Sequence, residues 1–167
     1  DRKLLTKNPY SRSGEKQGKI EYIVVHWVGN ANSSAIANRN YFENLRLTHK
    51  TRASAHYVIG LKGEVIQCIP NNEVAFHAGS HSMNRKSIGI ENCHPDWGGK
   101  FNDATYNSLI ELYLKINVDI EALIPLQKEK FPTETKIIIL SQVIQGEVPK
   151  YYYSSNGDAN FPYIPDN

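Results

Sequence analysis

The order of apolar and polar residues along the chain predicts strands that alternate with helices. Residues 20–27, IEYIVVHW, are mostly apolar and carry His26 near their end, before a glycine turn, which is typical of a buried strand. A hairpin is predicted over residues 54–70, because two β-rich runs flank Gly60–Gly63 and Pro70 closes the second run. The run KIIIL at residues 136–140 predicts another buried strand.

Two amphipathic helices are predicted among these strands. The first follows N-cap oxygens at residues 32–34. Its apolar residues recur with helical spacing and are Ile36, Ala37, Tyr41, Phe42 and Leu45. The second begins at Asn102 or Asp103. Its apolar stripe consists of Leu109, Leu112, Tyr113 and Ile116.

A short strand is predicted at KSIGIEN, residues 86–92, between the two helices. Side chains alternate across a strand, so Ile88 and Ile90 face one way while Gly89 and Glu91 face the other. Strands that alternate with helices indicate an α/β fold, with a mixed central sheet flanked by helices.

The length of 167 residues fits a single domain. We expect residues 1–19 to form a basic, irregular N-terminal arm and residues 20–167 to form the domain. The formal net charge is only +2, which gives no support for a nucleic-acid partner. No run of about eighteen apolar residues and no secretion signal are present, so we expect no membrane span.

The residues that carry chemistry are mainly histidines and one strand carboxylate. The six histidines include no HExxH pair, so any metal site must be assembled from distant strands. At the end of its strand, His26 is either a metal ligand or a histidine that hydrogen-bonds within the sheet. Glu91 lies among apolar residues, where it is either a proton acceptor with a raised pKa, a salt-bridge partner or an edge-strand residue. Cys68 and Cys93 form no metal motif and are expected to be free, buried thiols.

Three motifs in a fixed order carry a resemblance to a known family. The segments IEYIVVHWVGN, SAHYVIGLKGEVIQCIPNNEVAFHAG and NRKSIGIENCHPD resemble the zinc-dependent N-acetylmuramoyl-L-alanine amidases of the type-2 family. These are phage endolysins and bacterial autolysins that are related to peptidoglycan recognition proteins. The resemblance implies that family's fold and hydrolysis of the amide bond between N-acetylmuramic acid and the L-alanine of the stem peptide.

The resemblance also implies roles for four residues. His26 corresponds to the first Zn²⁺ ligand, and Glu91 to the general base that acts on the zinc-bound water. His77 corresponds to a residue that lines the substrate groove, and His56 to one that packs beneath it, so both are expected substrate-binding residues.

The remaining zinc ligands are where the sequence departs from the family. The family takes them from a late histidine and from a cysteine or aspartate before a proline. If Pro149 is that proline, these places hold Leu140 or Ser141 and Val148, and no histidine follows His94. Leucine and valine have no atom that binds zinc.

Three explanations of this departure stay open. The domain is a non-catalytic muropeptide-binding domain, or Glu147 or Asp158 joins His26 in an unusual zinc site. The third explanation is that residues from about 117 to 148 are wrongly recorded, through a reading-frame error or a misassignment. The expected partner is bacterial peptidoglycan, with an anionic wall polymer at the basic N-terminal arm and with neither nucleic acid nor membrane. We expect a monomer, made in the bacterial cytoplasm and acting on the cell wall after release as a phage or prophage lysin.

Overall fold

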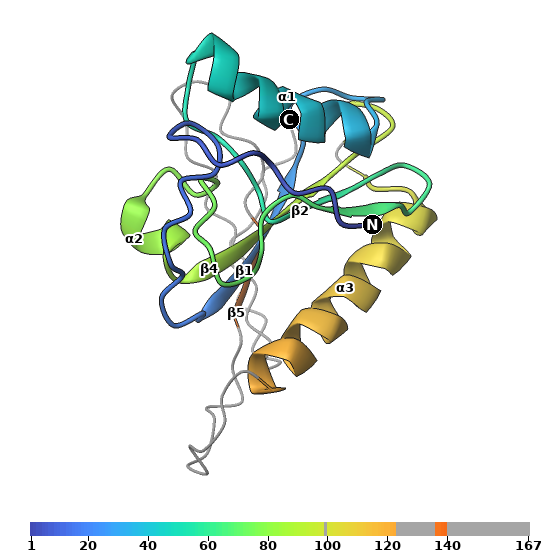
Figure 1. Ribbon diagram of the computed structural model, residues 1–167. Coiled ribbons are helices and arrows are strands. Elements are labelled where there is room, and N and C mark those ends of the chain that lie inside the picture. The colour runs from blue at the N-terminus through green and yellow to red at the C-terminus, as the bar shows by residue number, and fades with distance from the viewer. Residues whose placement is uncertain (99, 123–135, 140–167) are drawn as a thin grey trace, which may run out of the picture.

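A mixed sheet forms the centre of the fold (Figure 1). The computed structural model describes residues 1–98, 100–122 and 136–139, and within these ranges the sheet has five strands in the order β3-β2-β4-β1-β5. The strands are β1 (Tyr22–Trp27), β2 (Tyr57–Ile59), β3 (Val65–Gln67), β4 (Ser87–Asn92) and β5 (Lys136–Ile139). The predicted α/β fold with a mixed central sheet is confirmed.

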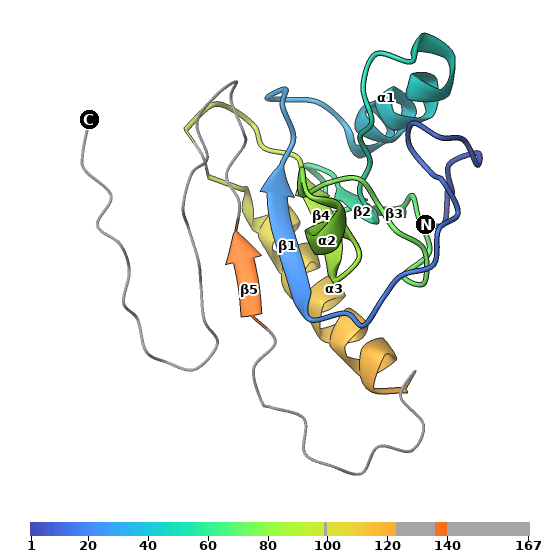
Figure 2. The same ribbon diagram turned by 90° about the vertical axis from the view of Figure 1, so that its left-hand side faces the viewer.

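The three strands β1, β4 and β5 run parallel, and β2 is parallel to β4. Figure 2 shows β5 and β1 side by side with the same direction. Only the hairpin partners β2 and β3 are antiparallel within the described part of the sheet, and they flank the predicted turn at Gly60–Gly63. Neighbouring parallel strands bring their carboxyl ends to the same edge of the sheet, where ligands of such folds commonly bind.

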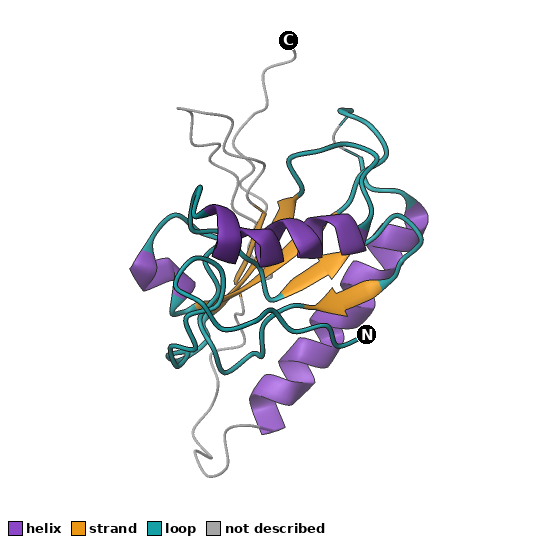
Figure 3. Cartoon of the chain, turned by 45° about the horizontal axis from the view of Figure 1, so that its top comes forward, coloured by secondary structure: helices purple, strands orange, loops and turns teal. Residues whose placement is uncertain are grey.

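Helix α1 (Ala35–Thr48) covers one face of the sheet (Figure 3). It begins where the Ser34 hydroxyl accepts a hydrogen bond from the Ala37 N–H. Its buried residues are Ala35, Asn38, Phe42 and Leu45. Of the predicted apolar residues, Phe42 and Leu45 are buried, whereas Ile36 and Tyr41 are 40% and 51% exposed, so this part of the prediction is wrong. The helix is rotated so that Asn38 faces the core, where its amide donates to the Ser33 hydroxyl and the Ser34 carbonyl.

Helix α3 (Asp103–Ala122) covers the opposite face (Figure 1). Its N-cap is Asn102, whose side-chain oxygen accepts a hydrogen bond from the Thr105 N–H. The predicted stripe is confirmed, since its members pack in one apolar cluster with the sheet residues Ile23, Val25, Ile88 and Ile90. A four-residue helix, α2 (His81–Asn84), precedes β4 and was not predicted.

The N-terminal segment, residues 1–19, has no helix or named strand, but it packs closely on the domain. The backbone N–H groups of Lys3 and Leu5 donate to the carbonyls of Gln67 and Cys68, so the segment runs along the outer edge of β3. Leu5 is buried in the apolar cluster beneath α1. The segment is therefore an irregular strap across the sheet edge and is held by main-chain hydrogen bonds.

Two further expectations concern the thiols and the membrane. Cys68 and Cys93 are both buried and free, as predicted. Among the helices in the described ranges, none combines the length and the apolar character that a membrane span requires.

Candidate functional site

His26 and Glu91 meet on one face of the sheet. They are paired in register on the adjacent parallel strands β1 and β4. Their neighbours Val25 and Ile90 belong to the cluster under α3, so the alternation of side chains turns His26 and Glu91 to the other face. The imidazole and the carboxyl group therefore start from neighbouring backbone positions on the same face of the sheet.

The carboxyl group of Glu91 is isolated within the part of the chain that the structure describes. Its Oε2 atom is buried without a hydrogen-bond partner, and no ion pair or hydrogen bond among the described residues involves this side chain. Burial raises the pKa of Glu91 to about 8, because the charged form loses its hydration. A salt bridge is therefore excluded among the described residues, and so is an edge position, because β4 lies between β2 and β1.

His77 contacts His26 on the same face. The Nε2 atom of His26 lies 3.0 Å from the Nδ1 atom of His77, and the two rings are nearly perpendicular. Burial lowers the pKa of His26 to about 4. Burial also lowers the pKa of His77 well below its ordinary value, and the neighbouring His26 and His56 rings lower it further. Both rings are therefore neutral at pH 7.

His56 lies beneath this pair and is completely buried. Its Nδ1 atom accepts a hydrogen bond of 3.0 Å from the Gly89 N–H, and its Nε2–H donates to the Glu73 carbonyl at 2.9 Å. Burial lowers the pKa of His56 to about 4, although the Glu73 carbonyl favours the protonated ring. His56 thus supports the site from below, and direct contact with a substrate would require this ring to become exposed.

Two residues that the sequence did not single out place the His77 ring. A Cβ atom at Gly89 would lie 2.4 Å from the His77 Cγ atom, so only glycine lets the ring lie against β4. The Asn84 side-chain oxygen accepts hydrogen bonds from the N–H groups of His77 and Ala78. A glycine inside a strand indicates a close approach, and this was the available signal for Gly89.

The loops that follow β1 and β4 are joined by His94, which is fully buried. Its two ring nitrogens lie 2.8 Å from the Val28 carbonyl oxygen and 2.6 Å from that of Asp96. The ring also packs against Trp27 and Trp97. Trp97 is 61% exposed, and its ring centroid lies 6.2 Å from that of Trp27, the last residue of β1.

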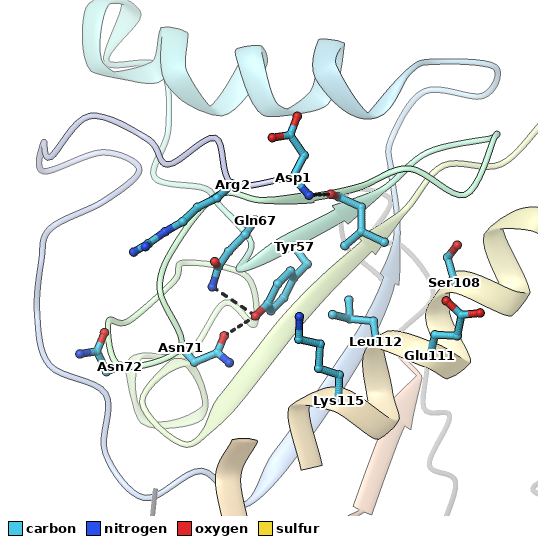
Figure 4. Close-up of a pocket in the computed structure, with 11 residues that line it drawn as sticks. Asp1, Arg2, Tyr57, Gln67, Asn71, Asn72, Ser108, Glu111, Leu112 and Lys115 are labelled. Carbon is cyan, nitrogen blue, oxygen red and sulfur yellow. Dashed lines mark hydrogen bonds between the residues drawn. The ribbon is translucent and has the colours of Figure 1, made fainter. Parts of the chain in front are cut away.

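A separate pocket of about 760 Å³ lies between the β2–β3 hairpin and α3 (Figure 4). The Tyr57 hydroxyl in this pocket donates to the Asn71 side-chain oxygen at 2.8 Å and accepts from the Gln67 amide at 3.2 Å. None of the four predicted site residues lines this pocket. The candidate site is therefore the His26–Glu91 face.

The zinc ion that the family resemblance implies needs three protein ligands at this site. In the described ranges, no three His, Cys, Asp or Glu residues lie close enough together to hold a metal ion. The expected late ligand positions, residues 140, 141 and 148, lie outside the described residues, as do the alternatives Glu147 and Asp158. The described residues thus provide His26 alone of the expected ligands, which does not fit a three-ligand zinc site.

Comparisons with known proteins agree on one family. The family profile described as N-acetylmuramoyl-L-alanine amidase matches residues 16–130. A probable N-acetylmuramoyl-L-alanine amidase from Bacillus licheniformis is 33% identical over 117 residues, which cover 63% of this chain and 32% of that protein. The chain thus spans about a third of the length of the curated relatives that it matches.

Solved structures agree on the fold. A mutant endolysin from Bacillus subtilis is 34% identical, with a TM-score of 0.55, and the match covers 69% of this chain and 74% of that one. The catalytic domain of XlyA is 28% identical, with a TM-score of 0.56, over 83% of this chain and 81% of that one.

Proposed function

Because the chain belongs to the N-acetylmuramoyl-L-alanine amidase family, we propose that this domain hydrolyses the amide bond between N-acetylmuramic acid and L-alanine in bacterial peptidoglycan. The observation that carries the proposal is the isolated carboxyl group of Glu91 in register with His26. A buried carboxyl group without a partner lowers the free energy of unfolding, so Glu91 does not serve the stability of the fold. A carboxyl group with a strongly shifted pKa is a common feature of sites that transfer protons.

Amide hydrolysis needs a proton acceptor for the attacking water and a proton donor for the departing amine. With a pKa of about 8, Glu91 is mostly protonated at neutral pH while a minor fraction is ionised. The ionised form accepts a proton from water as the oxygen attacks the amide carbon. The protonated form then donates that proton to the nitrogen of L-alanine, and the amine leaves. His26, neutral and adjacent, provides a nitrogen lone pair at the same face.

A second candidate function is muropeptide binding without turnover. The observation in its favour is the incomplete ligand set around His26 among the described residues. Family members use zinc for this hydrolysis, and a domain that keeps the groove without three ligands would retain recognition while losing the reaction.

One experiment separates the two functions. Purified protein is incubated with bacterial cell walls, and free amino groups and N-terminal L-alanine are measured over time, with and without added Zn²⁺. Release of L-alanine amino groups that Glu91→Gln abolishes supports the amidase. Thermal stabilisation by muropeptide without any release, retained in Glu91→Gln, supports the binding domain. If the protein shows no release of amino groups and no stabilisation by muropeptide, both functions are refuted.

The basic N-terminal segment is a proposed contact for an anionic wall polymer. Arg12 is used within the protein, because its guanidinium donates two hydrogen bonds to the Glu73 carboxylate. Lys7, Lys16 and Lys19 form no salt bridge within the described residues, although the charges of Lys7 and Lys16 help to lower the pKa of the Glu73 carboxyl group. Binding to teichoic-acid-containing walls should weaken as salt is raised, because the attraction is screened. We further propose that the domain acts as a monomer on the cell wall, after release from the cytoplasm of the producing cell.

A further inference from the structure

A chain of hydrogen bonds connects His26 to the start of β4. The Nε2 atom of His26 lies 3.0 Å from Nδ1 of His77, and Nε2 of His77 lies 3.2 Å from the Ser87 hydroxyl oxygen. That hydroxyl donates to the Met83 carbonyl at 2.6 Å. We call Ser87, His77 and His26 the relay.

The direction of every hydrogen bond in the relay follows from the bond between the Ser87 hydroxyl and the Met83 carbonyl. The Ser87 hydroxyl has one hydrogen, which it gives to the Met83 carbonyl, so toward His77 it accepts. His77 therefore carries its hydrogen on Nε2. A neutral imidazole has a single N–H, so Nδ1 of His77 is an acceptor and receives the Nε2–H of His26. Among the described residues no carboxylate forms an ion pair with either ring, so neither ring has a partner that would hold it as an imidazolium.

We propose that His77 and Ser87 are positioning residues that hold His26 in the Nε2–H tautomer and leave its Nδ1 atom as the lone-pair nitrogen of the site. The inference deepens the proposed function, since it names the His26 atom that accepts a hydrogen bond or binds an electrophilic group. Which nitrogen of a histidine is available is set by the hydrogen bond that the other nitrogen makes.

The surroundings of His77 hold the relay in place. Gly89 removes the side chain that would otherwise displace the ring, and Asn84 binds the backbone on which the ring is carried. The His56 ring meets the His77 ring edge-on, with centroids 5.9 Å apart. Ser87 is completely buried, so water does not compete for its hydroxyl. A ring that is fixed on these sides has little freedom to exchange its two nitrogens.

Nuclear magnetic resonance of histidine labelled with ¹⁵N tests the proposal directly. A long-range ¹H–¹⁵N correlation at pH 7 distinguishes a nitrogen that carries hydrogen from one that does not. We expect His26 and His77 each to show a protonated Nε2 and an unprotonated Nδ1. A protonated Nδ1 on His26 in the wild-type protein would overturn the proposal.

Variants of the positioning residues separate the relay from a purely structural role. His77→Phe removes the acceptor of the His26 Nε2–H, and Ser87→Ala removes the acceptor of the His77 Nε2–H. In both variants we expect His26 to show averaged signals of two tautomers. His77→Asn places an amide oxygen where Nδ1 was, so it should restore the single tautomer. The exposed His49→Gln is the matched control and should change neither ring. If both removal variants keep a single His26 tautomer, the positioning role is refuted.

The outcome does not depend on turnover. The spectra are recorded without substrate, so an inactive protein with the assigned tautomers would refute the hydrolysis and leave the relay intact. Amide dispersion in the same samples reports folding of each variant. If Ser87→Ala and His77→Phe both fail to fold, the wild-type spectrum and His77→Asn still decide the assignment.

Discussion

His26 lies directly opposite Glu91 across the β1–β4 pair, although 64 residues separate them in the chain. The parallel register brings both side chains to the face that α3 leaves uncovered. A one-residue shift of either strand would turn one of the two side chains into the apolar cluster under α3. The strand register therefore determines whether the site exists.

The substitution Glu91→Gln should remove hydrolysis and increase stability at neutral pH. Without proton transfer, we expect the release of L-alanine amino groups to fall by at least about 100-fold. Because the folded-state pKa of Glu91 is raised, its contribution to stability is present below about pH 4.5 and is lost as the pH rises toward 8. The variant should therefore exceed the wild type in free energy of unfolding at pH 7, by about 1–3 kcal/mol, and match it near pH 4.5.

Urea unfolding at several pH values, together with the cell-wall assay, checks both expectations for Glu91. Glu111→Gln is a suitable control, since Glu111 is an exposed carboxylate on α3. A Glu91→Gln protein with wild-type hydrolysis would contradict the proposed role of this residue.

The substitution His56→Gln should reduce the loss of stability in acid. The folded-state pKa of His56 lies near 4, so the unfolded chain takes up a proton first as the pH falls below 6.5. This one group removes about 1.4 kcal/mol of stability per pH unit between about 6.5 and 4. The slope of unfolding free energy against pH should therefore be smaller by that amount in the variant. An unchanged slope would show that His56 is protonated in the folded protein.

The substitution Gly89→Ala should displace the His77 ring. The added Cβ atom would meet three ring atoms of His77 between 2.4 and 2.7 Å, which requires the ring or the strand to move. We expect a loss of about 1–3 kcal/mol in the free energy of unfolding, as for other overpacked sites. In a His77→Ala background the same change should cost much less, since the ring is gone. Equal costs in both backgrounds, measured by thermal or urea unfolding, would disprove the clash.

The Arg12–Glu73 ion pair should anchor the N-terminal segment. Both side chains are only 12% exposed, and the guanidinium also donates to the Leu5 carbonyl. Arg12→Met leaves the Glu73 carboxylate buried without its partner, so we expect a loss of about 3 kcal/mol. Lys86→Met breaks an exposed pair with Glu21 and should cost less than about 1 kcal/mol. Similar costs for the two variants in urea unfolding would contradict this account.

The parts of the structure that sequence patterns predicted are those set by local alternation. The period of two in β4 separates Ile88 and Ile90 from Gly89 and Glu91, and the same rule orients His26 in β1. The buried face of α3 was also predicted, because the apolar residues of this helix all lie on one face.

The parts that the sequence did not predict depend on contacts between distant segments. The orientation of α1 follows from the buried side chain of Asn38. A prediction that considers only apolar residues does not place this polar residue in the core. The relay depends on where the loop before α2 places His77 against Gly89, and no periodic pattern encodes a loop path. The packing of Leu5 and Arg12 likewise results from tertiary contacts that override a polar, irregular sequence.

The strap of residues 1–5 along β3 also bears on self-association. Main-chain groups of Gln67 and Cys68 that would otherwise form an open strand edge are occupied by this strap. An uncovered edge is a template on which a second molecule can add a strand. Trimming the first few residues would therefore favour aggregation of this domain, even if His26 and Glu91 kept their positions.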